Sequence, residues 1–248
     1  MIVEFVGLPG AGKTTLAKEL DRLDPRLGAP FLAFEEYRAF NLEMGEIAIM
    51  RLGRMAFWRT IGPVCLRHPG LAFSLAVLMV LHGRPFKRRA RKARRVLAHV
   101  LFTERLLEHF PDRIVIHQDG FTQGIWGMVI DSRRLRGHRL IRWAMRNFYG
   151  SIPVRVLILE IDDTTVVKRV FERTSKGRFN TNSSPSQRAE FGRWLDYHRE
   201  IVKLLPENLA VSRIDASCDP AALATAALGA LASNSNRDEG PPPLRFEC

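Results

Sequence analysis

The residues most able to do chemistry form one octapeptide near the start of the chain, Gly7-Leu8-Pro9-Gly10-Ala11-Gly12-Lys13-Thr14. It matches the spacing G-x-x-x-x-G-K-[ST], whose glycines let consecutive backbone N–H groups converge on a polyphosphate at a helix N-terminus. Lys13 can reach the β- and γ-phosphates, and the Thr14 hydroxyl can bind a Mg²⁺ ion that bridges them. The segment predicts a nucleotide site made of Gly7, Pro9, Gly10, Ala11, Gly12, Lys13, Thr14 and Thr15.

A carboxylate at the end of an apolar run is the second candidate. The run Ile114-Val115-Ile116-His117-Gln118-Asp119 has the character of a buried strand that ends in an acid. Beside a phosphate-binding loop, such an aspartate holds Mg²⁺ directly or through water. A simple strand-end turn at Asp119-Gly120 is the alternative. With the loop present, Asp119 is expected to join Thr14 as a metal ligand.

Arginines form the third candidate, in the segment from Asp162 to Phe179. Arg169 and Arg173 are four residues apart and share one helix face, and Arg178 follows a turn at Gly177. Positioned arginines neutralise the charge that develops on a phosphoryl group during its transfer. The alternative is a solvated basic helix end. We expect these three arginines to belong to a lid over the phosphates.

The elements that must position these residues alternate between strand and helix patterns. This alternation predicts an α/β fold, a parallel sheet with helices on both faces. The five apolar runs that predict strands are Ile2–Val6, Pro30–Phe34, Arg113–His117, Val154–Ile161 and Leu209–Ile214. The sequence Ser184-Pro185-Ser186-Gln187 predicts a capped helix start, with proline at the first helical position.

The length of 248 residues suits one domain with an insertion. We predict a domain over residues 1–231, with a helical insertion at about 37–111 and a lid at about 168–185. The remainder, 232–248, is rich in Asn, Ser, Gly and Pro and is predicted to be disordered. No secretory signal pattern precedes Ile2, so we expect a cytoplasmic location.

The order of these features resembles that of the P-loop kinases of the nucleoside and nucleotide kinase group, which includes adenylate, thymidylate and deoxynucleoside kinases. The resemblance extends from Met1 to about Leu231 and implies a three-layer fold with a five-stranded sheet in the order 2-3-1-4-5. It also implies that Asp215 and Ala216, after the fifth strand, contact the adenine of ATP. Asp119-Gly120-Phe121-Thr122-Gln123 resembles the D-G-F-P-R segment of adenylate kinases, but Gln123 replaces the arginine that holds an acceptor phosphate.

Two glutamates follow the second predicted strand, where kinases of this group that phosphorylate a hydroxyl carry a general base. A carboxylate there can accept the proton of an attacking alcohol. Glu35 and Glu36 are both candidates, and the alternative is that they are surface charges or helix caps. Together with the missing arginine at Gln123, they favour an alcohol acceptor over a nucleoside monophosphate.

The chain is basic, with a formal charge of +12, which predicts an anionic partner. The run Arg84–Arg95 is expected to form a helix whose apolar residues, Ala90, Ala93, Leu97, Val100 and Leu101, lie opposite an exposed basic face. That face could contact an anionic membrane or nucleic acid, or could simply be solvated. A second basic stretch contains Arg133, Arg134, Arg136, Arg139, Arg142 and Arg146.

The sequence therefore predicts an ATP- and Mg²⁺-dependent phosphotransferase with a small-molecule or lipid-linked hydroxyl acceptor. A peripheral position at the inner face of the membrane would follow if residues 84–95 bind lipid. Two alternatives remain at this point: a polynucleotide 5′-hydroxyl kinase, which would use the basic runs, and an ATP-binding switch that transfers nothing. No histidine or cysteine spacing predicts a further metal site.

Overall fold

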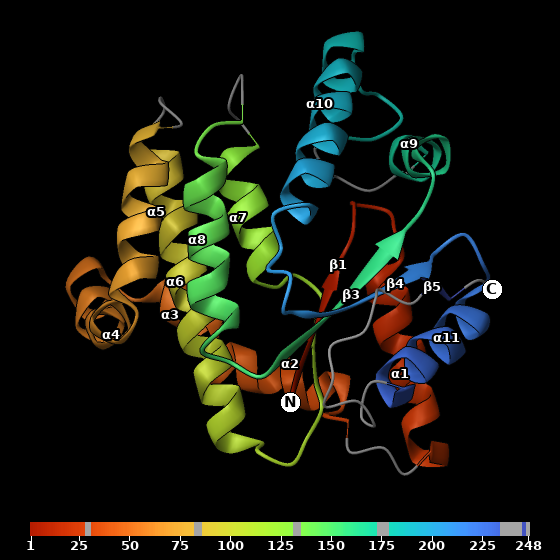
Figure 1. The fold of residues 1–248 in the computed structure, drawn as a ribbon, viewed down its shortest axis with the longest axis horizontal. Coiled ribbons are helices and arrows are strands. Elements are labelled where there is room, and N and C mark those ends of the chain that lie inside the picture. Colours follow the sequence, from red (N-terminus) through yellow and green to blue (C-terminus); the bar gives the residue numbers. More distant parts are fainter. Residues whose placement is uncertain (28–30, 82–85, 131–134, 173–178, 234–244, 247–248) are drawn as a thin grey trace.

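A parallel β-sheet forms the centre of the computed structural model, which describes residues 1–27, 31–81, 86–130, 135–172, 179–233 and 245–246 (Figure 1). Its strands lie in the order β2-β1-β3-β4-β5, and every pairing is parallel. The strands are β1 (Ile2–Val6), β2 (Val115–His117), β3 (Val154–Glu160), β4 (Ala210–Asp215) and β5 (Arg245–Phe246). The predicted α/β class with a parallel sheet is confirmed.

Four of the predicted strands are present as β1 to β4, in the order that was expected of them. The prediction of a fifth strand over 30–34 is wrong. Phe31 makes only an isolated parallel bridge to Ile114, and helix α2 (Phe34–Glu43) begins three residues later. Pro30 lies outside the described residues. The short β5 instead extends the sheet beside β4, within the segment that was expected to be disordered.

Each face of the sheet carries its own apolar core because side chains alternate along a strand. On one face, Val3, Phe5 and Leu157 pack against α1 (Lys13–Leu27) and α11 (Pro220–Ser233). On the other face, Ile2, Val156 and Ile158 belong to the core that includes residues of α6, α7 and α8. The helices on this second face are α6 (Phe86–His109), α7 (Phe121–Val129), α8 (His138–Tyr149) and α10 (Pro185–Val202).

Five helices occupy the predicted insertion. They are α2, α3 (Glu46–Arg51), α4 (Arg54–Arg67), α5 (Pro69–Leu81) and α6. Helix α5 packs beside α8, and α4 leads into it across a bend of 115°. Between β3 and α10 lies α9 (Asp163–Phe171), whose first turn is capped by the Asp162 carboxylate. The capping box predicted at Ser184 is confirmed, with Pro185 at the first turn of α10.

Helix α6 bears out the expected exposed basic face along residues 84–95 only in part, with Arg91 and Arg95 exposed. The apolar side chains Ala93, Leu97 and Val100 point inward, as predicted. Arg89, however, is only 2% exposed, and the Arg94 guanidinium lies 4.0 Å from the centre of the Phe57 ring. The reason is that helices of the insertion cover α6 on its polar side as well. Residues 84 and 85 and the side chains of residues 86–88 lie outside the description.

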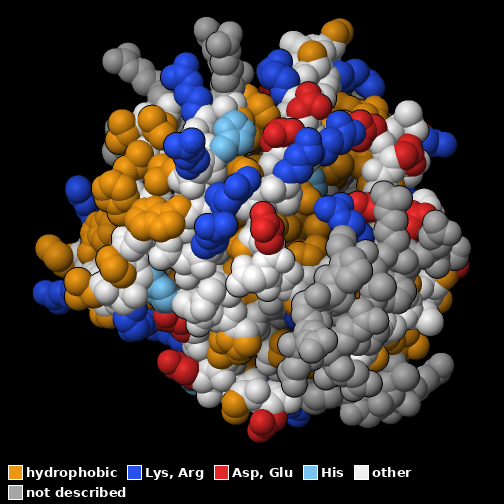
Figure 2. All heavy atoms as spheres, viewed as in Figure 1, with side chains coloured by type: hydrophobic (Ala, Val, Ile, Leu, Met, Phe, Trp, Pro, Cys, Tyr) orange, Lys and Arg blue, Asp and Glu red, His pale blue; other side chains and the backbone are white. Residues whose placement is uncertain are grey.

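The surface of the molecule is divided between apolar and basic areas (Figure 2). Hydrophobic side chains gather on the side where Figure 1 shows α4 and α5, with Lys and Arg side chains beside them. Among the described residues, no single helix has the length and apolar composition to cross a membrane, although the bent pair α4–α5 meets both criteria when taken together.

Candidate functional site

The octapeptide forms a tight turn between the carboxyl end of β1 and the first turn of α1. Gly10 and Gly12 have φ values of 97° and 88°, in the left-handed region that side chains disfavour. Gly7 lies against β3, because a Cβ atom there would come within 3.2 Å of the Leu159 Cβ. The Lys13 ammonium reaches back across the turn and donates to the carbonyls of Gly7 and Leu8, at 2.6 and 3.2 Å. The loop thus has the backbone conformation that the motif predicts.

A cavity of about 530 Å³ opens over this turn, and we call it the loop cavity. It brings Lys13 and Thr14 together with Asp119, which follows β2, and with Arg169 of α9. The Arg169 guanidinium lies 3.5 Å from the Gly10 carbonyl and 3.4 Å from the Ala216 carbonyl. The described residues that line it are Leu8, Pro9, Gly10, Gly12, Lys13, Thr14, Thr15, Asp119, Arg169, Ala216, Cys218, Pro220 and Leu223.

These residues meet because parallel strands end at one edge of the sheet. β1 and β2 are neighbours, so their carboxyl ends place the loop and Asp119 side by side. β1 also pairs with β3, and the chain leaves these two strands in different directions, which is where ligands bind in open α/β sheets. The exposed Thr14 hydroxyl and Asp119 carboxylate are hard oxygen donors, which suit Mg²⁺.

Some residues predicted for the site lie elsewhere. Gly7 and Ala11 support the turn without lining the cavity, and the Asp215 carboxylate accepts a hydrogen bond from the Ser217 N–H at 2.8 Å. Glu35 and Glu36 are exposed in the first turn of α2 and line neither cavity described here. The Glu35 carboxylate lies 3.8 Å from Arg38 on the same helix. Arg173 and Arg178 lie outside the described residues.

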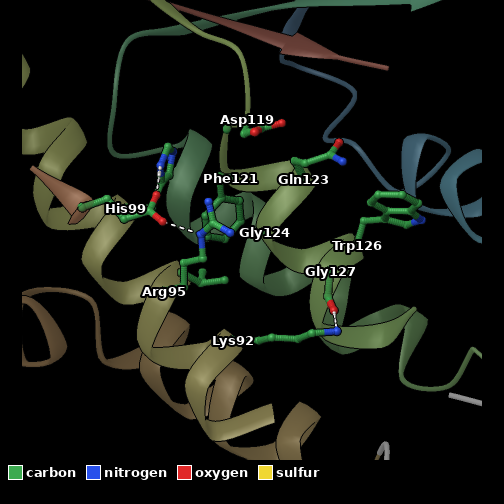
Figure 3. Close-up of a pocket in the computed structure, with 12 residues that line it drawn as sticks. Lys92, Arg95, His99, Asp119, Phe121, Gln123, Gly124, Trp126 and Gly127 are labelled. Atoms are coloured by element: carbon green, nitrogen blue, oxygen red, sulfur yellow. Dashed lines mark hydrogen bonds and ion pairs between the residues drawn. The ribbon is translucent and has the colours of Figure 1, made fainter. Parts of the chain in front are cut away.

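A second cavity, of about 250 Å³, adjoins the first, and we call it the helical cavity (Figure 3). Asp119 lines both cavities. Lys92 and Arg95 extend from α6 towards α7, while Asp119 and Gln123 lie at one end. Among the described residues, the lining is Glu46, Lys92, Arg95, Val96, His99, Asp119, Gly120, Phe121, Gln123, Gly124, Trp126 and Gly127.

Glu46 is a carboxylate that the sequence did not single out. Its side chain is only 14% exposed and is held by the Arg95 guanidinium and by His99 Nδ1, which lies 3.6 Å away. Burial opposes ionisation, but the hydrogen bond from His99 and the charge of Arg95 outweigh it and lower the pKa of Glu46. Because these residues come from α3 and α6, 49 positions apart, no local pattern could have revealed the cluster.

A buried glutamate, Glu4, supports the segment that follows Asp119. The Glu4 carboxylate accepts hydrogen bonds from the Thr122 N–H at 2.8 Å and from the Tyr149 hydroxyl at 2.8 Å. Glu4 lies so close to Gly120 that a Cβ atom there would approach it to 2.2 Å. Burial raises the pKa of Glu4, and these hydrogen bonds only partly offset that effect. Glu4 thereby fixes the start of α7, and Asp119 with it, against β1.

Two buried histidines surround this region. Burial and the nearby charge of His99 lower the pKa of His117 well below its ordinary value. His198 of α10 has a pKa lowered to about 4 by burial and by the positive charges of Lys13 and Arg199. Both imidazoles are therefore neutral near pH 7. They therefore contribute no positive charge to this region.

Comparisons with known proteins add little to this geometry. A scan against protein-family models matches no family, and a search of curated proteins finds no match. Among solved structures, the chain is similar to deoxyadenosine kinase from M. mycoides, solved with the products dCMP and a flexible dCDP bound. The TM-score is 0.40 at 11% identity, and the match covers 94% of this chain and 100% of that one. A likeness at this level supports no conclusion about activity.

Proposed function

We propose that this chain is an ATP-dependent phosphotransferase that transfers the γ-phosphoryl group to a hydroxyl of an acceptor in the helical cavity. The observation that carries the proposal is the position of Asp119, which lines both the loop cavity and the helical cavity. A donor phosphate over Lys13 and a hydroxyl beside Gln123 would meet at this carboxylate. In-line transfer requires donor and acceptor to be held in that relation.

The loop cavity supplies the donor site in this proposal. The backbone N–H groups of the turn and the Lys13 ammonium would hold the β- and γ-phosphates. Thr14 and Asp119 would hold Mg²⁺, which neutralises phosphate charge when it is bound. Ala216 and Leu223 line the end of the cavity that would receive the adenine. Arg169 is placed to contact the transferred phosphoryl group, in the role that we also propose for Arg173 and Arg178.

The helical cavity supplies the acceptor site. At about 250 Å³ it suits a small hydroxylated group, such as a free small molecule or the head of a lipid-linked acceptor. The neutral amide of Gln123 can hydrogen-bond a hydroxyl or carbonyl, whereas an arginine in its place would favour a phosphate. These features support an alcohol acceptor over a nucleoside monophosphate.

Glu46 is the strongest candidate for the general base. Its carboxylate is ionised, lines the helical cavity and is oriented by two partners, as a proton acceptor must be. Glu35 and Glu36 remain alternatives, and serving as the base would require α2 to bring an exposed side chain into a cavity. In either case the carboxylate would take the hydroxyl proton as the new O–P bond forms, while the bond from the γ-phosphorus to the β–γ bridging oxygen breaks and ADP leaves.

The test is an acceptor screen with γ-labelled ATP and Mg²⁺ across alcohols, sugars, nucleosides, nucleoside monophosphates, lipid extracts and 5′-hydroxyl oligonucleotides. We expect label on a hydroxyl of a small or lipid-linked acceptor, and none with Lys13→Ala. Preferential labelling of a monophosphate or an oligonucleotide would overturn the proposed acceptor class. Slow ATP hydrolysis that no acceptor stimulates would instead indicate the non-transferring switch.

A further inference from the structure

Three surface helices of the described chain contain no acidic residue. Helices α4, α5 and α8 contain no Asp or Glu over 54–67, 69–81 and 138–149. They carry six arginines: Arg54, Arg59, Arg67, Arg139, Arg142 and Arg146. Arg67 is paired with Glu104 of α6, whereas Arg139, Arg142 and Arg146 are exposed at spacings of three and four residues on α8. These three therefore form one positive row on the outside of the molecule.

An apolar row lies beside these arginines. Helix α5 has no charged residue, and its outer face exposes Phe73 by 60% and Val80 by 72%. Trp143, between two arginines of α8, is 42% exposed and meets the Phe73 ring edge-on at a centroid distance of 6.1 Å. Helix α4 adds further exposed apolar side chains, namely Met55, Trp58 and Leu66. We call this combination of α4, α5 and α8 the apolar–arginine face (Figure 2).

This combination has the chemistry of a membrane interface. Exposed apolar area of this kind marks a docking surface, because water contact with it is unfavourable. Tryptophan and arginine are well suited to the headgroup region, where one part of the side chain is apolar and the other is solvated. Positive charge on helices that carry no acidic residue of their own is complementary to anionic lipid headgroups. A symmetric contact with a second copy would instead bring two arginine rows together with no carboxylate on these helices to neutralise them.

We propose that the apolar–arginine face binds the surface of an anionic lipid bilayer, with α4 and α5 lying in the interface and the arginines of α8 contacting headgroups. The bend of 115° between α4 and α5 fits helices that lie along a surface. This location differs from the run 84–95, where Arg89 is buried and Arg94 packs on Phe57. The proposal is independent of the phosphotransferase activity, since it uses no residue of either cavity.

The test is flotation of the full chain with vesicles of phosphatidylcholine alone or with 30% phosphatidylglycerol, at low and high salt. We expect binding to the anionic vesicles that weakens with salt. Each arginine at an anionic surface contributes about fivefold to partitioning, so Arg139→Gln, Arg142→Gln and Arg146→Gln combined should weaken it on the order of 100-fold. The control replaces exposed arginines far from this face, with the same loss of net charge: Arg22→Gln, Arg38→Gln and Arg193→Gln.

A second variant tests the apolar row. Phe73→Ser with Val80→Ser removes exposed side chains and should leave the circular dichroism unchanged while reducing vesicle binding at least tenfold. The matched control is Leu42→Ser with Met44→Ser, which are exposed elsewhere. Equal binding by parent and face variants would overturn the proposal. So would a concentration-dependent dimer, seen by sedimentation equilibrium, that Phe73→Ser with Val80→Ser dissociates, because the face would then be a contact between copies of this chain.

Discussion

The loop cavity and the helical cavity share Asp119 but are built in different ways. More than half of the described lining of the loop cavity comes from the contiguous segment 8–15, where Gly10 and Gly12 have positive φ values. The helical cavity lies between the segment 119–127 and side chains of α3 and α6, namely Glu46, Lys92, Arg95, Val96 and His99, and only the tertiary fold brings these parts together. A site made of backbone can be read from a motif, whereas a site made of distant side chains cannot.

This difference predicts that the two cavities have separate roles, nucleotide binding in the loop cavity and acceptor binding in the helical cavity. Substitutions in the loop cavity should affect binding of the nucleotide whatever the acceptor is, because every acceptor uses the same donor. Substitutions in the helical cavity should affect turnover and acceptor affinity while leaving nucleotide binding unchanged. Each prediction below tests that division, beginning with the largest expected effect.

Glu46→Gln should lower turnover by about 10²- to 10⁴-fold, the usual contribution of general-base assistance. MgATP affinity should change little, because Glu46 lines only the helical cavity. Steady-state kinetics with the acceptor found in the screen would measure the effect. Glu35→Gln and Glu36→Gln are the matched controls. A large loss of turnover in either control, together with normal turnover of Glu46→Gln, would show that the general base is the glutamate predicted from the sequence.

Gln123→Ala should raise the KM for the acceptor by about 2- to 10-fold, the value of one neutral hydrogen bond. The KM for ATP should stay the same. Gln123→Arg offers the complementary test, since a guanidinium holds phosphate oxygens well and should improve the use of phosphorylated acceptors. An equal change in both KM values would show that the two cavities are not separate sites.

The two buried carboxylates should give opposite pH dependences of stability. The pKa of Glu4 is raised by burial, so the free energy of unfolding of the parent should fall relative to Glu4→Gln as pH rises above the ordinary carboxyl range. The pKa of Glu46 is lowered despite burial, by His99 and Arg95. Its contribution is therefore present above the ordinary range and lost as pH falls. Urea unfolding from about pH 3 to about pH 8 would measure both slopes.

Ser184→Ala should lower the free energy of unfolding by about 1 kcal/mol, because it removes the side chain that caps α10. Ser184→Asp keeps a capping oxygen and should lose less. Trp194 of α10 packs edge-on against Trp126 in the wall of the helical cavity. The acceptor KM should therefore respond to this change more than the nucleotide affinity does, and the reverse response would contradict the division between the cavities.

The sequence predicted the features of this fold that depend on local pattern. Apolar runs predicted the positions of β1 to β4, and the sequence from Ser184 to Gln187 predicted the start of α10. The run at 30–34 misled because Phe31 and Leu32 are buried as a strand would be, yet α2 starts at Phe34 before a ladder can form. Burial alone does not distinguish a strand from the residues that precede a helix.

In the candidate site too, the residues that belong to a local motif were predicted, and those that depend on distant contacts were not. Lys13, Thr14, Asp119 and Arg169 were predicted, and the structure brings them into one cavity. Glu46 was missed because its partners His99 and Arg95 lie about 50 residues away. The basic face of α6 was overestimated for a related reason: helical periodicity cannot show that α3, α4 and α7 pack on the polar side. Both the missed Glu46 and the overestimated basic face of α6 depend on contacts between residues far apart in the sequence.

The central claim is that the Gly7–Thr14 turn holds the phosphates of a nucleotide, and calorimetric titration of MgATP into the parent and Lys13→Ala tests it most directly. Loss of a charged hydrogen-bonding partner should weaken binding by about 10- to 100-fold or more. Circular dichroism should stay unchanged, because the Lys13 ammonium donates to the Gly7 and Leu8 carbonyls within the same loop. Equal MgATP affinity in a folded Lys13→Ala protein, or no MgATP binding by the parent, would contradict the account.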